Sequence, residues 1–385
     1  SGHSNIWAAA FQSVGIDAKV LPMPDEQSEE LGRKYASARE CHPYLVTTGD
    51  LVKKAQSNDF DPDRSAFVTL NFDGSCRMSQ YGLSQKLVLK RLGFSHVPVI
   101  APITSIRHDD ASRMFGIKWA MAIWKGWLAT DVLLKKLLHT RPYEINKGES
   151  DRVYEKAIQD ISAGIIKGDF DKALKNSIAV MDAIPVKKES RPIIGIVGEF
   201  YSCMNSWANN DIIRVLESLG AEVRYGPSTT DYLVYFNESY PGIHLSRGEY
   251  LAALYYYVRR LWFMGWKEKI EGMLGDDLYE DCRVPRVAER VETASPYVTD
   301  AIDPVVTVNL SKAENYAMSS CSGIANLIVL NCLYGTLATA IYKKVQREHN
   351  QIPMLTMIYE GLKPTNEKTR IEAFVYQVKS YYERY

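Results

Sequence analysis

Three cysteines, Cys41, Cys76 and Cys332, each lie in a short polar break directly before a stretch with the pattern of a helix. The free N–H groups and the dipole at a helix N-terminus favour a thiolate, so we expect these positions to lower the cysteine pKa. Cysteine thiolates are the usual ligands of iron–sulfur clusters. Three of them would hold a [4Fe–4S] cluster and leave one iron without a protein ligand, as a substrate-binding cluster requires.

Two of these cysteines also follow apolar runs that are typical of buried strands. Cys76 comes after a strand predicted at residues 66–70, and Cys332 after one at residues 325–330. The carboxyl ends of parallel strands form the functional edge of an α/β sheet. The alternative is that each cysteine is a small buried hydrophobic residue, the usual fate of a free cysteine. The spacing contains no compact Cys-x-x-Cys motif, so both interpretations stay open.

Four further residues are candidate catalytic groups: Glu199, Tyr201, Arg77 and His42. Glu199, together with Tyr201, follows an apolar strand at residues 192–198, where a carboxylate could act as a general base or make structural hydrogen bonds. Arg77 could donate to cluster sulfides, or form an ordinary salt bridge. His42 could donate a proton, or cap the helix that it begins.

The other three of the six cysteines are weaker candidates. Cys203 follows the same strand as Glu199 and is a candidate extra ligand, whereas we expect Cys282 and Cys321 to be buried hydrophobic residues. Zinc is a rival cofactor, because the three leading cysteines and His42 could form a Cys₃His site. Structural zinc usually takes closely paired ligands, however, and these cysteines are 35 (41 to 76) and 256 (76 to 332) positions apart.

Several short segments follow one another in an order that resembles the 2-hydroxyacyl-CoA dehydratase and benzoyl-CoA reductase superfamily. The segments are Gly32-Arg33-Lys34, Glu40-Cys41-His42-Pro43, Thr47-Thr48-Gly49-Asp50, Gly74-Ser75-Cys76-Arg77 with Gln80-Tyr81, and Gly198-Glu199-Phe200-Tyr201. The chain looks most similar to the acyl-CoA dehydratase activase-related, double-cubane-like component, over almost its whole length. Cys41, Cys76 and Cys332 fall on the positions that carry cluster-ligating cysteines in that family.

The resemblance implies two Rossmann-like lobes with an iron–sulfur cluster between them. It also implies electron supply from a separate ATP-hydrolysing activator, a small or acyl-CoA-like substrate, pairing into a homodimer and a role in anaerobic metabolism. Some members hold a double-cubane [8Fe–9S] cluster with six cysteines, but a single [4Fe–4S] cluster is the simpler expectation here. The sequence itself contains no phosphate-binding glycine motif, so any ATP step belongs to a partner or a missing domain.

Three hypotheses of function follow. The leading one is an iron–sulfur reductase component that accepts low-potential electrons from an activator and reduces a small substrate at the cluster. The second is a non-catalytic electron-transfer or scaffold module of a larger activase-like protein. The third is a zinc-stabilised or metal-free α/β binding protein.

Alternating strands and helices predict an α/β fold with two Rossmann-like lobes, parallel sheets and an intervening helical region. We expect a first lobe at residues 1–108, the helical region at 109–190, and a second lobe at 191–385 with a helical insertion at about 245–300. A helix at 5–14 comes before any strand, so the first lobe would lack its first strand and the chain could be a fragment. The remaining strands are predicted at 18–22, 66–70, 97–101, 192–198, 221–225, 305–308, 325–330 and 353–358.

The composition of the 385 residues is that of an ordinary globular protein, with 46% hydrophobic and 24% charged residues. Lysine plus arginine equals aspartate plus glutamate at 46 each, so nothing indicates electrostatic capture of nucleic acid or of an anionic membrane. The longest apolar run, residues 114–138, carries several charges and is a poor membrane span. No secretory signal is visible, and the scattered cysteines do not resemble a disulfide scaffold, so we expect a cytoplasmic protein with reduced thiols.

Overall fold

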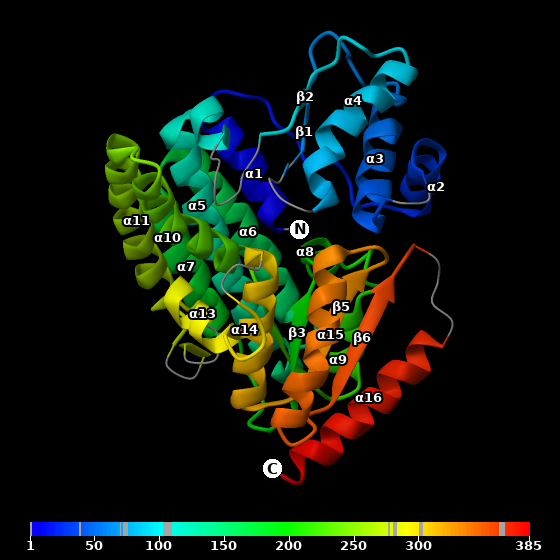
Figure 1. The fold of residues 1–385 in the computed structure, drawn as a ribbon, viewed down its shortest axis with the longest axis vertical. Helices are drawn as coiled ribbons and strands as arrows, with labels where there is room; N and C mark the ends of the chain where they lie inside the picture. The colour runs from blue at the N-terminus through cyan, green and yellow to red at the C-terminus, as the bar shows by residue number, and fades with distance from the viewer. Residues whose placement is uncertain are drawn as a thin grey trace.

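The computed structural model describes residues 2–37, 40–69, 71, 76–102, 110–275, 278–279, 283–299, 303–361 and 366–385. It confirms an α/β fold with two parallel sheets and a helical region between them in the chain. Figure 1 shows the small first lobe (α2–α4) above the second lobe, with the helical region along one side of both. No helix among the described residues is both long and apolar enough to span a bilayer.

The second lobe is built on a four-stranded parallel sheet with the order β4-β3-β5-β6. Its strands are β3 (Ile193–Gly198), β4 (Glu222–Tyr225), β5 (Cys321–Val329) and β6 (Met354–Tyr359). The predicted strands at 192–198, 221–225, 325–330 and 353–358 are therefore confirmed. From β3 the chain moves outward to β4 on one side, and from β5 to β6 on the other. The point where the strand order reverses thus lies between β3 and β5, where doubly wound sheets bind ligands outside their carboxyl ends.

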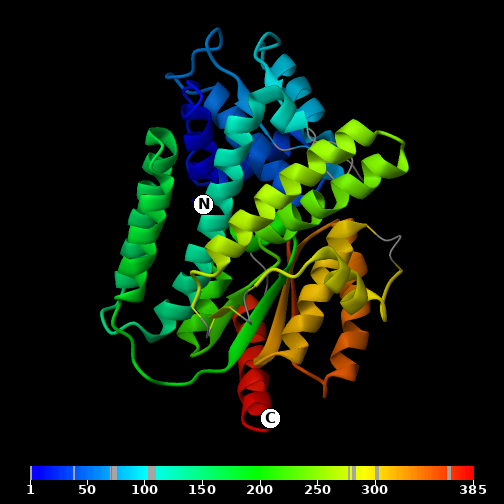
Figure 2. The ribbon, with the colours of Figure 1, turned by 90° about the vertical axis from the view of Figure 1, so that its left-hand side faces the viewer.

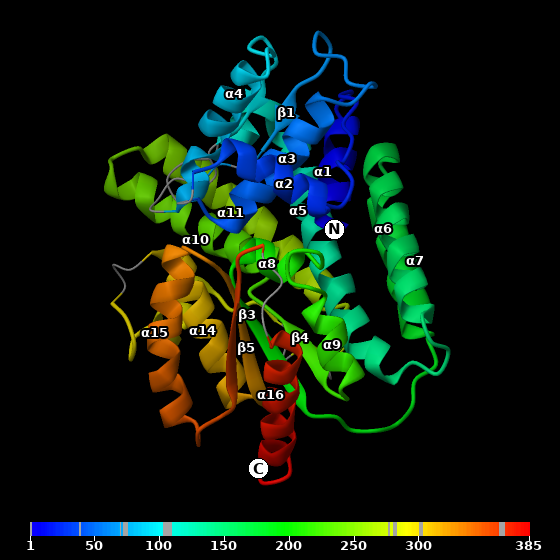
Figure 3. The same cartoon turned by 90° about the vertical axis from the view of Figure 1, so that its right-hand side faces the viewer.

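Helices cover both faces of this sheet, as Figure 3 shows. One face packs against α14 (Pro304–Met318) and α15 (Leu333–Glu348) through side chains that include Leu310 and Ala338. The other packs against α9 (Ile212–Ser218) and α16 (Glu367–Tyr382) through Leu216 and Phe374. The central strand β5 is buried at every position because it lies between these two layers.

The first lobe holds a smaller parallel sheet and three helices. β1 (Phe67–Val68) pairs with β2 (Val99–Ile100), and the helices are α2 (Glu26–Tyr35), α3 (His42–Ala55) and α4 (Tyr81–Arg91). The strands expected at 66–70 and 97–101 are present in shorter form, and Leu70 lies outside the described residues. The prediction of a strand at 18–22 was wrong. Neither sheet of the described chain includes these residues.

Two glycines allow α2 and α3 to approach each other closely. A Cβ at Gly49 of α3 would lie 1.5 Å from the carbonyl oxygen of Ser28, and one at Gly32 of α2 would lie 1.9 Å from that of Leu45. Both contacts are to backbone, so neither neighbour can move aside cheaply. The two glycines therefore fix how α3, which begins just after Cys41, sits in the lobe.

The helical region is centred on α5 (Asp110–Thr140). Around it pack α1 (Gly2–Gln12), α6 (Glu149–Lys167), α7 (Phe170–Asp182), α10 (Thr229–Ser246) and α11 (Tyr250–Glu271). These helices share one core, which includes Ile6, Trp119, Leu133, Ile161 and Phe263. Figure 2 shows the α10–α11 hairpin crossing in front of the other helices.

Two further segments differ from the prediction. The strand expected at 305–308 is instead the first turn of α14, where Pro304 occupies a position that suits proline and the Asp303 carboxylate accepts a hydrogen bond from the Val305 N–H at 2.9 Å. Helix α10 was not predicted. It begins with a reciprocal capping contact between Ser228 and Asp231, a Ser-x-x-Asp pattern that is visible in the sequence.

Candidate functional site

Each of the three leading cysteines is the residue directly before a helical segment. Cys41 precedes α3, Cys332 precedes α15, and Cys76 precedes the short 3₁₀ helix η1 (Arg77–Gln80). All three have extended backbone, and the Cys332 Sγ accepts a hydrogen bond from the Gly335 N–H at 3.3 Å. The predicted placement at helix starts is therefore correct.

The three thiols come from different parts of the fold and lie close enough to influence one another's charge. The pKa of Cys76 is raised by burial first, and further by the neighbouring Cys41, Glu199 and Cys332. The pKa of Cys332 is raised by burial, by Glu199 and by Cys41. Cys41 and Cys76 belong to the first lobe, whereas Cys332 follows β5 of the second, so the electrostatic effect joins thiols of the two lobes near the carboxyl edge of the larger sheet.

Burial overrides the helix dipole at all three positions. The pKa is raised to about 12 for Cys76 and to about 11 for Cys332, and that of Cys41 also rises. The expectation that helix N-termini would lower these pKa values is therefore wrong for this structure. Gathering several acidic groups away from water without a cation disfavours the ionised form of each.

Glu199 lies at the end of β3, among these thiols. Its side chain caps the short helix α8 (Phe200–Met204), accepting hydrogen bonds from the Tyr201 and Ser202 N–H groups at 2.9 Å each. Burial nevertheless raises the pKa of the Glu199 carboxyl, and its charge raises the pKa of Cys41, Cys76 and Cys332. The carboxylate thus makes structural hydrogen bonds and also lies at the candidate site.

The preceding residue, Gly198, explains how β3 can end so close to β5. It has a φ of +137°, and a Cβ there would lie 2.0 Å from the Leu327 carbonyl oxygen. Only glycine fits such a backbone at such a distance. This contact places Glu199 at the point where the strand order reverses.

Tyr81 is a site residue that we did not assign from the sequence. Its Oη lies 2.7 Å from the Cys41 Sγ, and its ring packs edge-to-face on Tyr44 with centroids 5.2 Å apart. Burial and the neighbouring Cys41 raise the pKa of Tyr81, which keeps the phenol protonated and able to donate. No local pattern predicts this contact, because it joins the start of α4 to the start of α3.

The His42 ring and the Tyr201 hydroxyl are both buried polar groups. Neither ring nitrogen of His42 has a partner, its Nε2 is 3.9 Å from Glu29, and its ring stacks on Trp207. Burial lowers the pKa of His42 to about 4, so the imidazole is neutral at pH 7. Helix α3 has Cys41 as its N-cap residue and no side-chain capping hydrogen bond, so the predicted capping role of His42 is wrong. Burial raises the pKa of the Tyr201 hydroxyl, and the charges of Asp50 and Glu199 raise it further.

The remaining candidates lie in different surroundings. Arg77 donates from Nη1 to the Asn331 carbonyl oxygen at 2.7 Å. Cys203 on α8 is buried in the core of the second lobe. Cys321 begins β5, so at ~3.3 Å per residue it lies about 26 Å along the strand from the end that leads to Cys332. Cys282 lies outside the described residues, and the five cysteines within them are free thiols.

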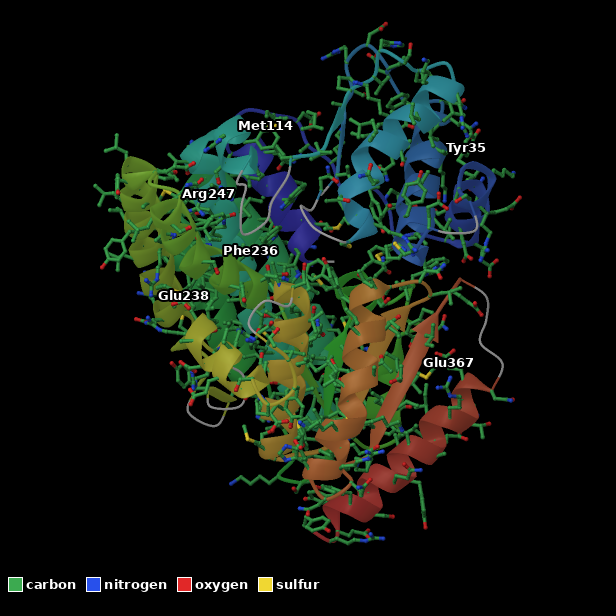
Figure 4. All side chains as sticks on the ribbon, viewed as in Figure 1. Tyr35, Met114, Phe236, Glu238, Arg247 and Glu367 are labelled. Atoms are coloured by element: carbon green, nitrogen blue, oxygen red, sulfur yellow. The ribbon has the colours of Figure 1, made fainter. Side chains whose placement is uncertain are left out.

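Among the described residues, no group of three or more His, Cys, Asp or Glu side chains is placed to hold a metal ion. The three thiols are thus electrostatic neighbours that are not gathered around one point. Two cavities, of about 450 and 300 Å³, lie elsewhere. The larger lies at β2 and the start of α5, where Figure 4 labels Met114, and the smaller is lined by Arg141 and Glu217. Neither is lined by the three cysteines.

Comparison with protein-family models and with curated proteins finds no match to this chain.

Proposed function

We propose that this chain is a cytoplasmic iron–sulfur reductase component with a [4Fe–4S] cluster held by Cys41, Cys76 and Cys332. It would take low-potential electrons from an ATP-hydrolysing activator and deliver them to a small or acyl-CoA-like substrate. The observation that carries the proposal is that three thiols from two lobes, one buried and two half-buried, each precede a helical segment and influence one another's pKa near the point where the strand order of the larger sheet reverses.

The donor set suits such a cluster. Cysteine thiolates are the usual ligands of such a cluster. Coordination to iron would also deprotonate the three thiols, whose pKa values are raised in the structure by burial and by Glu199.

The protein's own groups have defined tasks in this proposal. Tyr81 would donate a hydrogen bond to the Cys41 sulfur, and the N–H of Gly335 would do so for Cys332. Such contacts stabilise added electrons and raise the reduction potential. The cluster would supply one-electron transfer at its iron without a cysteine ligand. Glu199 would act as the buried acid or base beside it, since its raised pKa favours holding a proton.

A second candidate is a non-catalytic electron-transfer module. Neither described cavity reaches the cysteines, and Cys41 is only 8% exposed. A cluster without a substrate cavity beside it would pass electrons to another protein and bind no substrate at iron.

Spectroscopy separates the two candidates. We would reconstitute the protein with iron and sulfide under anaerobic conditions, reduce it chemically, and record electron paramagnetic resonance with and without cyanide as a probe ligand. The reductase proposal predicts a reduced-cluster signal that cyanide changes, because one iron is open. A signal that cyanide leaves unchanged would favour the electron-transfer module, and the lack of any signal would overturn both.

A further inference from the structure

The smaller of the two cavities lies at the joint between the helical region and the second lobe. Its volume of about 300 Å³ is at the lower end of the range for small-molecule sites. Its walls come from the 3₁₀ helix η2 (Arg141–Tyr143), the turn that leads into α6, the segment before β3, and the end of α9. Four separate parts of the chain therefore meet around this space.

The cavity lies at the opposite edge of the larger sheet from the candidate cluster site. Arg191, which lines the cavity, lies two residues before β3. Glu199 directly follows the other end of β3, where the cysteines lie. At ~3.3 Å per residue, the six residues of β3 separate the two edges by about 20 Å. The cavity is therefore a separate site.

Most of the side chains that line the cavity are charged. The cations are Arg141, Lys147, Arg191 and Arg214, and the carboxylates are Glu144, Asp151 and Glu217. The cations therefore outnumber the carboxylates by one (four less three). Such a lining attracts small anions more strongly than cations, because the side chains around the space carry a net positive charge.

The three carboxylates already have hydrogen-bond or ion-pair partners. Arg141 donates from Nε and Nη2 to the two oxygens of Glu217 at 2.8 Å each. Asp151 accepts from Nη1 of Arg141 at 3.1 Å and pairs with Nη2 of Arg214 at 2.6 Å. Glu144 accepts from two backbone N–H groups at the start of α6, at 2.6 and 2.9 Å. These contacts leave the carboxylates little capacity to bind a cationic ligand.

Several cationic donors, by contrast, remain available to a ligand. Arg141 is only 7% exposed, yet the contacts above use three of the five N–H groups that a guanidinium carries. Arg214 pairs through Nη2 alone within the described chain. Lys147 forms no hydrogen bond or ion pair with any residue that the structure describes. Arg191 is the exception, because its Nε donates to Glu189 at 3.0 Å.

The positions of these donors favour an anion with more than two oxygens. Arg141 comes from η2, Lys147 from the turn before α6, and Arg214 from α9, so the three cations approach from different elements. A carboxylate offers two oxygens in one plane. A phosphate group offers at least three oxygens in a tetrahedral arrangement, and guanidinium groups bind it through paired hydrogen bonds. Phosphate is therefore the anion that can satisfy all three donors together.

We propose that this cavity binds a phosphate group through Arg141, Lys147 and Arg214, either as inorganic phosphate or as the phosphate of a small monoester. The proposal is independent of the iron–sulfur function. Bound phosphate links η2 of the helical region to α9 of the second lobe and stabilises the folded chain, as any ligand of the folded state does. The alternative is a purely structural network of ion pairs that binds no ligand.

The test is isothermal titration calorimetry of the full chain with inorganic phosphate and, separately, with glycerol 3-phosphate. Sodium chloride keeps the ionic strength constant, so that general screening does not change during the titration. Wild type should bind one phosphate group per chain with a Kd of about 1 mM or below. Tighter binding of glycerol 3-phosphate would identify a monoester as the ligand, and equal or weaker binding would identify the free ion.

Three alanine variants locate the binding. Lys147→Ala and Arg214→Ala should each weaken binding about tenfold, because each removes a charged donor. Lys147→Ala is the decisive variant, since it breaks no contact of the described chain. Lys175→Ala, at an exposed lysine of α7 that does not line the cavity, should bind as wild type does. Circular dichroism confirms that each variant is folded.

Two kinds of result would overturn the proposal. Wild type that shows no saturable binding of either compound at tens of millimolar would leave a structural ion-pair network. Unchanged affinity in Lys147→Ala and Arg214→Ala, or an equal loss in Lys175→Ala, would show that the anion binds elsewhere on the surface.

Discussion

Arg77 donates a hydrogen bond from Nη1 to the carbonyl oxygen of Asn331 at 2.7 Å, across 254 positions of sequence. Arg77 directly follows Cys76, and Asn331 directly precedes Cys332. One hydrogen bond therefore joins the two loops that carry cysteines from opposite lobes. Asn331 has a φ of +65°, a left-handed conformation that asparagine tolerates better than most residues and that turns the chain from β5 into α15.

Removal of this link should loosen the candidate cluster. Arg77→Ala is expected to release iron to a chelator about tenfold faster than wild type after reconstitution, since groups that orient metal ligands typically contribute at least that factor. The measurement is the rate of iron transfer to a coloured chelator. Arg33→Ala is the comparison variant, because it removes another contact between the lobes, to the Glu360 carbonyl oxygen at 3.2 Å, together with the Arg33–Glu29 ion pair, and no hydrogen bond of Arg33 reaches a loop next to Cys76 or Cys332 in the described chain. Equal rates in the two variants would contradict a specific role for Arg77.

The Tyr81 hydroxyl should tune the potential of the cluster. Tyr81→Phe removes a donor 2.7 Å from the Cys41 sulfur and is expected to lower the midpoint potential by about 40 mV, the one-electron equivalent of a hydrogen bond of about 1 kcal/mol. A redox titration followed by electron paramagnetic resonance measures this shift. Tyr44→Phe, which keeps the ring that packs on Tyr81, should leave the potential unchanged. A Tyr81→Phe potential equal to that of wild type would show that the hydroxyl does not act on the cluster.

Asp50 should make the folded protein less stable as the pH rises. Burial raises its folded-state pKa from 3.8 to about 6, so the folded chain holds this proton more tightly than the unfolded chain does. The free energy of unfolding therefore falls as the pH rises above about 4. The loss is complete above pH 6, where it amounts to roughly 3 kcal/mol. Asp50→Asn should therefore melt at a higher temperature than wild type at pH 8, and the gain should shrink toward pH 4.

Asp25 provides the opposite control for this pH dependence. Its pKa is lowered to about 2, chiefly by the Lys53 ammonium, so its carboxylate favours folding above pH 4 and loses that effect in acid. Asp25→Asn should lower the melting temperature at pH 8 and approach wild type as the pH falls. A gain for Asp50→Asn that did not depend on pH would contradict the assigned pKa.

The close contact of α2 and α3 should depend on Gly49. Gly49→Ala places a Cβ 1.5 Å from the Ser28 carbonyl oxygen, so we expect a loss of at least 2 kcal/mol, about the upper range for overpacking. Gly242→Ala, in α10 with open space around its Cβ, should instead stabilise by about 0.5–1 kcal/mol. Chemical unfolding of both variants measures the two effects. Stabilisation by Gly49→Ala would show that the helices are less closely packed than described.

Much of the larger sheet could be predicted from the sequence, because each strand is a compact apolar run that ends at a turn. Strands β3 and β5 were placed correctly, and with them the positions of Glu199 and Cys332 at the carboxyl edge. The error at residues 305–308 has a physical cause. Valine and threonine favour strands locally, but Pro304 and the capping Asp303 begin a helix there, and packing on the sheet stabilises it.

The chemical detail of the site was less predictable. The contact between Tyr81 and Cys41, and the effect of the Asp50 charge on the pKa of Tyr201, join separate elements and leave no local pattern in the sequence. The raised thiol pKa values likewise depend on burial and on which acidic groups lie near one another in the fold. The position of each cysteine before a helix contains no information on either.

The most direct test of the account is the iron and sulfide content of the protein after anaerobic reconstitution, in wild type and in five serine variants. Wild type should hold about four irons and four sulfides per chain, as one cubane cluster requires. Cys41→Ser, Cys76→Ser and Cys332→Ser should each lose them, whereas Cys203→Ser and Cys321→Ser should retain them. A wild type that binds zinc or no metal, or iron that persists in all three site variants, would contradict the assignment of the cluster to these cysteines.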